Sequence, residues 1–282
     1  MIAPAVAGPV VATQRPGRLR EFGFRSLFPL TTIGLVLFIL VPQFLLLSLS
    51  VSERFDLKGG VLPVGFSADA YMRWGEDIVK AAGASMAVAL PTVFLALLIG
   101  TPVAYALARL QFTGKALVVE LVNLPMIFPP IVLGFGLFQL FRSGALPPLP
   151  PLLTLIAAHT VVATPFMIRP LLLAIQRVDP ALEEASLSLG ASRLTGFMRV
   201  VLPQLLPALL TGIALTFARS ISDFEITFLL AGGDLATLPV TIYQAFETGS
   251  SRLGAAVAMA GNVFAICVIV SLELVIKKAK WW

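Results

Sequence analysis

Residues 183–203 read EEASLSLGASRLTGFMRVVLP, a stretch of acidic, hydroxyl, glycine and arginine side chains between two strongly apolar runs. Asp179 followed by Pro180 predicts the start of a helix, because an aspartate side chain caps a first turn and proline fits inside it. Gly190 predicts the end of that helix, and Ser192 predicts the cap of a second one that Pro203 terminates. The stretch therefore predicts two short amphipathic helices that meet at a glycine.

Two interpretations of this helix pair stay open, a docking surface for another protein and an interfacial element that lies on lipid. The first helix carries two acids and no base, which favours docking. One apolar face of this helix is predicted to rest on the ends of longer helices: Leu182, Ala185, Ser186 and Leu189. Three polar side chains would then remain available to a partner: Glu183, Ser188 and Arg193.

Composition places the rest of the chain in a membrane. Of 282 residues, 58% are hydrophobic and 12% charged, about half the charged share of a soluble domain. A helix needs roughly 20 apolar residues to cross the bilayer. Six runs meet that length, at about 26–51, 81–108, 118–141, 152–175, 204–230 and 253–276. We therefore predict an all-α membrane protein with six spans in a domain over 26–278, an external loop at 52–80 and a polar loop at 177–203.

Lysine and arginine in the loops predict the orientation. Twelve lie on one side: Arg15, Arg18, Arg20, Arg25, Arg109, Lys115, Arg177, Arg193, Arg199, Lys277, Lys278 and Lys280. Six lie on the other: Arg54, Lys58, Arg73, Lys80, Arg142 and Arg252. Both the amino-terminal segment 1–25 and the tail 279–282 are predicted to be cytoplasmic, and the 183–203 stretch lies on the same side. The bases form no dense stripe, so no nucleic-acid partner is predicted.

The order Glu184, Ala185, Ser186, Gly190, Ala191, Phe197, Leu202 and Pro203 resembles the EAA loop of binding-protein-dependent ABC importer permeases. Residues 101–109 (TPVAYALAR) and 124–134 (LPMIFPPIVLG) resemble the second and third spans of that family. The resemblance covers roughly residues 25–278 and implies the type I importer permease fold. Residues 222–233 and 238–243 look closest to permeases for polyamines, ferric iron, phosphonates and thiamine, which implies a small charged solute of that group.

The resemblance also implies the partners. In this family the EAA loop is the coupling helix that fits a groove on the ATP-hydrolysing subunit, so the implied coupling residues are Glu183, Glu184, Ala185, Gly190, Ala191 and Arg193. The chain has no phosphate-binding G-x-x-x-x-G-K-[ST] loop of its own. ATP and Mg²⁺ are thus expected on two separate ATPase subunits, and no cofactor on this chain. A second permease subunit, identical or related, an external solute-binding protein and a location in the bacterial inner membrane are also implied.

Three ionisable residues lie late in the fifth predicted span: Arg219, Asp223 and Glu225. Charges inside a membrane are candidates for a translocation pathway. Arg219 and Asp223 are four residues apart, so a purely structural pair on one helix face is the alternative. His159 is interpreted as a packing residue, since a single imidazole without nearby cysteine or carboxylate ligands predicts no metal site.

Small residues on the last two spans fit either an interface between two permease subunits or packing inside one: Gly212, Ala214, Ala218, Gly254, Ala255, Ala258 and Gly261. Two other functions are alternatives to an ABC importer permease. An ion-coupled secondary transporter would use the three charged residues, but the internal repeats usual in such folds are not evident. An intramembrane enzyme lacks its motifs here, so this chain is predicted not to be an enzyme.

Overall fold

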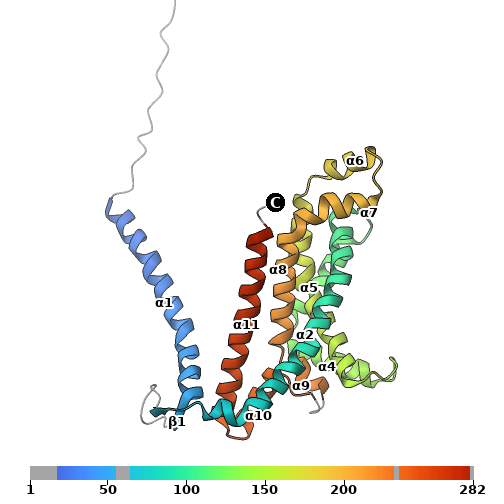
Figure 1. The fold of residues 1–282 in the computed structure, drawn as a ribbon. Helices are drawn as coiled ribbons and strands as arrows, with labels where there is room; N and C mark the ends of the chain where they lie inside the picture. Colours follow the sequence, from blue (N-terminus) through green and yellow to red (C-terminus); the bar gives the residue numbers. More distant parts are fainter. Residues whose placement is uncertain (1–17, 55–63, 232–234, 280–282) are drawn as a thin grey trace, which may run out of the picture. The chain divides into compact units, whose positions relative to one another are not determined.

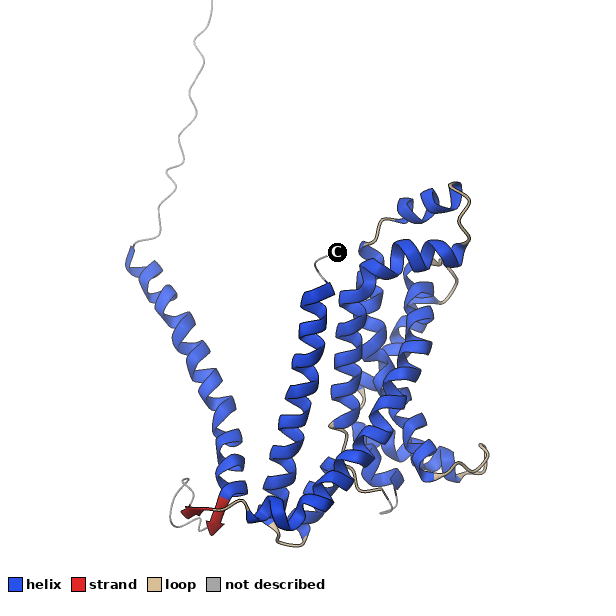
Figure 2. Cartoon of the chain, in the orientation of Figure 1, coloured by secondary structure: helices blue, strands red, loops and turns tan. Residues whose placement is uncertain are grey.

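The structure, a computed structural model, describes residues 18–54, 64–231 and 235–279. Nearly all of them are helical, with one short antiparallel strand pair (Figures 1 and 2). The longer helices are α1 (Arg18–Val51), α2 (Asp69–Arg109), α5 (Pro151–Arg177), α8 (Leu202–Ile221) and α11 (Ser251–Ala279). The shorter elements are β1 (Ser52–Arg54), β2 (Val64–Phe66), α3 (Lys115–Ile127), α4 (Pro130–Arg142), α6 (Pro180–Ser188), α7 (Arg193–Gly196), η1 (Phe197–Val201), α9 (Glu225–Ala231) and α10 (Leu238–Glu247).

Two compact units divide the chain at Leu45. The described part of the first unit is most of α1, whose residues Phe28–Val51 form an apolar helix of 24 residues. Large hydrophobic side chains along it are exposed, among them Phe38 at 77%. This agrees with the predicted first run at 26–51. All further elements belong to the second unit.

The core of the second unit lies where α2 and α8 pack on α5. Met167, Leu171 and Ile175 of α5 are fully buried there. Gly100 and Gly212 permit this approach, because a Cβ atom at Gly212 would lie 2.7 Å from Met167 Sδ and one at Gly100 would lie 3.0 Å from Met167 Cγ. Gly212 therefore serves packing inside the chain, one of the two roles that the sequence left open.

Among the described residues, five helices are long and apolar enough to span a membrane, and a sixth is added if α3 and α4 count as one span. Those two helices are bent by 105° at Phe128–Pro129. The consecutive prolines Pro129 and Pro130 explain the break, since neither can continue the hydrogen-bond ladder of α3. The predicted run at 118–141 is thus a broken element rather than one continuous helix.

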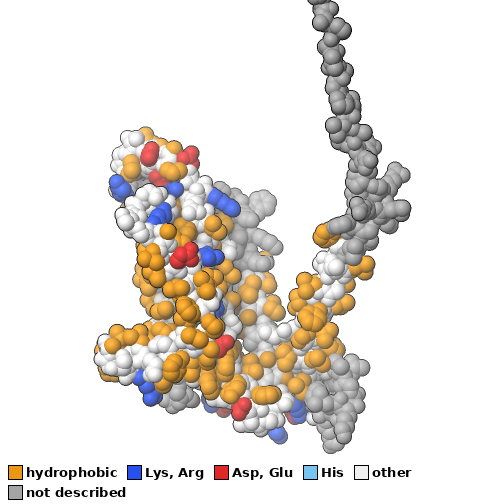
Figure 3. All heavy atoms as spheres, turned by 180° about the vertical axis from the view of Figure 1, so that it is seen from behind, with side chains coloured by type: hydrophobic (Ala, Val, Ile, Leu, Met, Phe, Trp, Pro, Cys, Tyr) orange, Lys and Arg blue, Asp and Glu red, His pale blue; other side chains and the backbone are white. Residues whose placement is uncertain are grey.

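The predicted run at 204–230 is broken as well. The helix α8 ends at Ile221, and α9 begins after a short connection at Ser222–Phe224. The helix that contains the second predicted run starts earlier than expected, because α2 begins at Asp69 and includes the polar residues before position 81. Figure 3 shows mainly hydrophobic side chains between the ends of these helices, with charged ones gathered toward the ends.

The loop at 177–203 folds largely as predicted. The Asp179 side chain accepts a hydrogen bond from the N–H of Ala181 at 2.9 Å, and the Ser192 hydroxyl accepts one from Thr195 at 3.2 Å. Gly190 has φ +90°, the left-handed conformation that ends α6. One prediction is wrong: Pro203 does not terminate the second helix, and Arg193–Ile221 is continuous.

The π-helical turn η1 (Phe197–Val201) explains this continuity. Proline lacks an N–H donor, and its ring clashes with the carbonyl four residues earlier in a regular α-helix. A widened turn before the proline relieves that clash. The helix therefore passes through Pro203, and α7 is joined to α8 without a gap.

Candidate functional site

The short helices α6 and α7 lie at one end of the second unit, beside the last turn of α2 (Figure 1). There the Glu183 carboxylate of α6 accepts hydrogen bonds from Arg109 Nη2 at 2.7 Å, Arg109 Nε at 2.8 Å and the Tyr105 hydroxyl at 2.5 Å. Arg109 Nη2 also donates to the carbonyl of Val178, which follows the last residue of α5, at 2.9 Å. We call these four residues the Arg109 clamp.

The Arg109 clamp joins three elements at one point. Arg109 and Tyr105 come from the end of α2, Val178 is the C-cap of α5, and Glu183 lies in α6. The side chains of Arg109 and Glu183 are only 14% and 18% exposed, so solvent weakens this ion pair less than it would a surface pair. A displacement of α6 is therefore passed to α2 and α5.

The prediction that Glu183 is free for a partner is wrong, because its carboxylate is engaged inside the chain. The other predicted coupling residues are accessible: Glu184, Ala185, Gly190 and Arg193 are exposed, and Ala191 is half-buried. Ser188, which was predicted to be available to a partner, is exposed as well. The predicted resting face is wrong too. Leu182 is 45% exposed and Leu189 is 89% exposed, so α6 presents apolar side chains outward. Such a surface suits docking of a protein.

The contact between α6 and α7 depends on Gly196. Ser186 donates its hydroxyl to the carbonyl of Glu183 at 2.7 Å. A Cβ atom at Gly196 would lie 2.6 Å from Ser186 Oγ, which is too close for any real side chain. Gly196 therefore lets α7 approach α6 closely, next to a cavity of about 290 Å³ that Glu183 and Phe197 help to line.

Arg219 near the end of α8 and Asp223 just beyond it belong to a network of hydrogen bonds inside the chain. Arg219 Nη1 donates to Asp223 Oδ2 at 2.7 Å, so these two side chains form an ion pair. Asp223 Oδ1 accepts from the N–H groups of Ile226 at 3.0 Å and Thr227 at 3.2 Å. Asp223 thus caps α9 and is only 3% exposed. Glu225 is half-buried at the start of α9.

His159 completes this network from α5. Its Nδ1 lies 2.9 Å from Ser220 Oγ, and its Nε2 lies 3.0 Å from Thr227 Oγ1. Both ring nitrogens therefore have partners, as expected for a packing histidine. A search of the described residues finds no group of three metal-binding side chains. The cluster fixes α5, α8 and α9 to one another around the break in the chain.

Sequence reasoning did not assign functional roles to Tyr105, Arg109 or Ser220. Arg109 was used as a base that sets orientation and as the last residue of the stretch that resembles the family's second span. What matters in the structure is its position at the end of α2, close in space to the start of the polar loop. The sequence signal that could have indicated this ion pair is a base in the last turn of one helix, Arg109, together with an acid in the first turn of another, Glu183. Without the fold, the separation of 74 residues between them concealed it.

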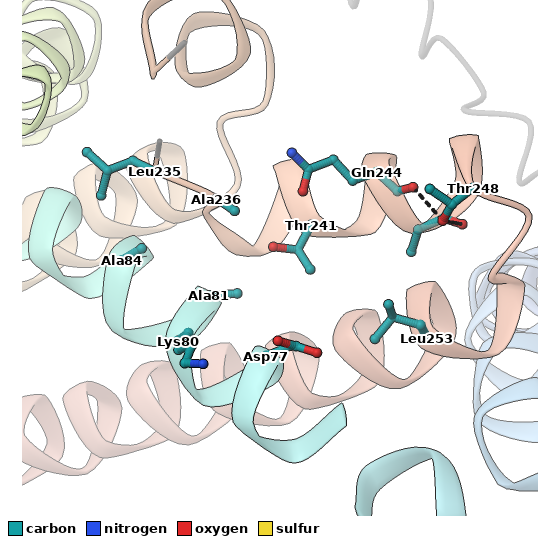
Figure 4. Close-up of a pocket in the computed structure, with 11 residues that line it drawn as sticks. Asp77, Lys80, Ala81, Ala84, Leu235, Ala236, Thr241, Gln244, Thr248 and Leu253 are labelled. Carbon is teal, nitrogen blue, oxygen red and sulfur yellow. Dashed lines mark hydrogen bonds between the residues drawn. The ribbon is translucent and has the colours of Figure 1, made fainter. Parts of the chain in front are cut away.

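A second cavity, of about 510 Å³, lies at the opposite end of this unit, between the start of α2, α10 and α11. Figure 4 shows Asp77 and Lys80 on α2 and Thr241 and Gln244 on α10 around it. These side chains carry one acid, one base and two neutral polar groups. The cavity therefore has no strong preference for either sign of charge.

Comparison with known proteins identifies this arrangement. A profile of the family described as binding-protein-dependent transport system inner membrane component matches residues 93–279, well over half of the chain. The chain belongs to this family. It is the permease subunit of an ABC importer, with several membrane helices, and it is not an enzyme: ATP hydrolysis belongs to a separate subunit. The alternative function, an ion-coupled secondary transporter, is therefore rejected.

This permease is 33% identical over 239 residues to the probable molybdenum ABC transporter permease of Haloferax volcanii, covering 83% of this chain and 86% of that protein. It is 30% identical to the sulfate transport system permease of Salmonella typhimurium, covering 62% and 69%. A crystal structure of a bacterial ABC transporter involved in the import of the acidic polysaccharide alginate matches with a TM-score of 0.66 at 21% identity, covering 94% and 99%. That likeness shows the fold alone.

These relatives correct the expected solute group. Their names give molybdenum and sulfate, not polyamines, ferric iron, phosphonates or thiamine. The prediction rested on the six-span topology and on residues 222–233 and 238–243. Of these residues, the structure describes 222–231, which form the capped break and α9, and 238–243, which begin α10. Residues that fix helices in place carry little information about the solute.

Proposed function

We propose that this permease forms half of the pathway for a tetrahedral oxyanion of the molybdate and sulfate type. An external binding protein delivers the anion, and a second permease, identical or related, supplies the other half. Two ATPase subunits bind ATP and Mg²⁺, and each docks on α6 of one permease at the cytoplasmic face of a bacterial inner membrane. The single observation that supports the solute class is the 33% identity over 83% of this chain to a molybdenum permease.

The Arg109 clamp gives this proposal a mechanical basis. When the ATPase pair closes on ATP, it draws the two α6 helices together. Since Arg109 binds both Glu183 and the carbonyl of Val178, α2 and α5 follow α6 as one body. This movement opens the outer side to the binding protein, and ATP hydrolysis reverses it. Glu184, Leu182 and Leu189 form the exposed surface that meets the ATPase in this scheme.

Of the three pathway candidates, Arg219 suits an oxyanion best. Asp223 is buried and fully used by Arg219 and by the cap of α9, and Glu225 would repel an anion. Arg219 Nη2 is buried without a hydrogen-bond partner among the described residues. An unpaired N–H of a guanidinium is costly to bury, and we propose that this group becomes accessible when the pathway opens and then donates to the oxyanion.

The test is uptake into proteoliposomes that contain the permease, its ATPase and its binding protein. We expect ATP-dependent accumulation of radioactive molybdate or sulfate and none of phosphate or of spermidine. Replacing ATP by ADP is the control for energy coupling. Glu184→Lys is expected to abolish uptake without loss of membrane insertion, because it reverses charge on the exposed face of α6. Accumulation of spermidine, or of no tetrahedral oxyanion, would refute the proposed solute class.

A further inference from the structure

A cavity of about 410 Å³ lies between α2 and the segment formed by α7 and the start of η1, and it shares Tyr105 with the Arg109 clamp. Six described residues line it: Thr101, Pro102, Tyr105, Arg193, Leu194 and Phe197. The rings of Tyr105 and Phe197 meet edge to face at 5.4 Å and also line the cavity near Glu183. The cavity is apolar except for the Arg193 guanidinium and the Tyr105 hydroxyl.

The apolar wall of this cavity continues a stripe along α2. Leu90, Phe94, Leu98 and Pro102 recur every four residues, so they share one helix face. The first three are 54%, 63% and 61% exposed, and Pro102 is exposed as well. A wholly apolar, exposed face on a membrane span is suited to contact with acyl chains. An acyl chain that lies on this stripe reaches the cavity at Pro102.

The segment 193–199, which borders the cavity through Arg193, Leu194 and Phe197, has the composition of an interfacial helix. Arg193 and Arg199 are exposed, and the apolar Leu194 and Met198 between them are 69% and 53% exposed. Bases combined with exposed apolar side chains are typical of helices that lie in the headgroup region. Arg193 forms no ion pair with a carboxylate within 4.0 Å among the described residues. It is therefore available to a phosphate.

The cavity extends along α2 from its end as far as Thr101. Thr101 lies eight residues before Arg109 at the end of α2, which corresponds to about 12 Å along the helix. The cavity thus extends from the level of the helix ends into the outer part of the hydrocarbon layer. Thr101 Oγ1 is buried and offers no donor to the cavity, so at this depth the cavity presents apolar surface.

We propose that this cavity binds an anionic phospholipid, with its phosphate on Arg193 and one acyl chain along Leu90, Phe94, Leu98 and Pro102. This proposal rests on the proposed function only in the choice of leaflet, because the proposed function places α7 on the cytoplasmic side of the membrane. That leaflet carries anionic headgroups that attract bases near the surface. The bound lipid occupies the space next to Tyr105 and Phe197, and so it stabilises the position of α7 against α2.

The experiment measures lipid binding directly on the purified full-length permease complex. The complex is exchanged into nanodiscs of phosphatidylcholine with increasing phosphatidylglycerol, and lipids retained after mild detergent extraction are counted by native mass spectrometry. We expect retention of phosphatidylglycerol over phosphatidylcholine. Arg193→Gln is expected to weaken it about fivefold, since one base near a membrane surface contributes on that scale. Arg199→Gln is the matched control, because Arg199 lies on the same segment but outside the cavity.

A second variant tests the apolar wall without touching a charge. Pro102→Trp places a bulky ring in the groove and is expected to reduce retention while the complex still forms. Equal retention of both lipids, or equal loss in Arg193→Gln and Arg199→Gln, would overturn the proposal. So would an Arg193→Gln variant that loses its ATPase on purification yet retains phosphatidylglycerol, because Arg193 would then serve protein docking. None of these readouts depends on which solute is transported, so failure here and failure of the proposed function are separable.

Discussion

At the scale of single residues, Arg109 offers the most direct test of the coupling between α6 and α2. We expect Arg109→Gln and Glu183→Gln each to lower stability by about 2 kcal/mol, the size of a hydrogen bond to a charged group. Each should also lower the number of solute molecules moved per ATP hydrolysed, because α6 loses its connection to α2.

The double variant Arg109→Gln with Glu183→Gln should lower stability by less than the sum of the two single variants, with a coupling of about 1–2 kcal/mol. Glu184→Gln, an exposed neighbour on α6, is the control and should change stability by less than about 0.5 kcal/mol. Strict additivity of the two single variants, measured by thermal unfolding of the purified complex, would contradict a direct interaction.

Asp223 offers a second test at this scale. Asp223→Asn leaves Arg219 buried beside a neutral partner and is expected to destabilise the permease by about 3 kcal/mol. Asp223→Ala should cost about 1 kcal/mol more, because it also removes the cap of α9. Arg219→Gln combined with Asp223→Asn should recover part of the loss, since no unpaired charge remains. A double variant no more stable than Asp223→Asn alone would show that the pair contributes little.

At the scale of elements, the contact of α6 with α7 is sensitive to a single methyl group. We expect Gly196→Ala to destabilise this contact by about 1–2 kcal/mol, because its Cβ atom would meet Ser186 Oγ at 2.6 Å. Adding Ser186→Ala should restore stability, since Ser186 Cβ lies 3.7 Å from that position, an ordinary contact. Gly136→Ala on α4 is the control, because nothing lies within 4 Å of its added Cβ atom. Proteolysis of the 177–203 loop measures the effect, and a loss that Ser186→Ala does not relieve would contradict the geometry.

The same loop shows how far sequence reasoning extends. The caps at Asp179 and Ser192 and the left-handed Gly190 were predicted correctly, because each depends on a few neighbouring residues. Pro203 was misread, since a π-turn that accommodates proline has no local sequence signal. The exposure of Leu182 and Leu189 and the burial of the Glu183 carboxylate were also missed. They depend on where the end of α2 lies, which no helical periodicity within α6 can reveal.

At the scale of the whole molecule, the second unit has two distinct ends, and the proposed function assigns them to opposite sides of the membrane. Leu189 near α6 is 89% exposed, and Met72 at the start of α2 is 84% exposed. In a Cys267→Ser background, which removes the single native cysteine, Leu189→Cys should react with an impermeant maleimide only in inverted vesicles. Met72→Cys should react only in right-side-out vesicles. The bases at the ends of the spans set this orientation, and the opposite pattern would place α6 outside the cell.

The π-turn at Phe197–Val201 finally determines in which direction α6 points. Such a turn contains one residue more than a regular α-helical turn would hold. Deleting one residue there would restore the regular spacing and rotate everything before it by about 100° around the axis of α8. Glu183 would then be carried away from Arg109, although no residue of the ion pair had changed. Chain length at this one turn is thus a property that homologous permeases must share if they are to align the same face of α6 with the same ATPase.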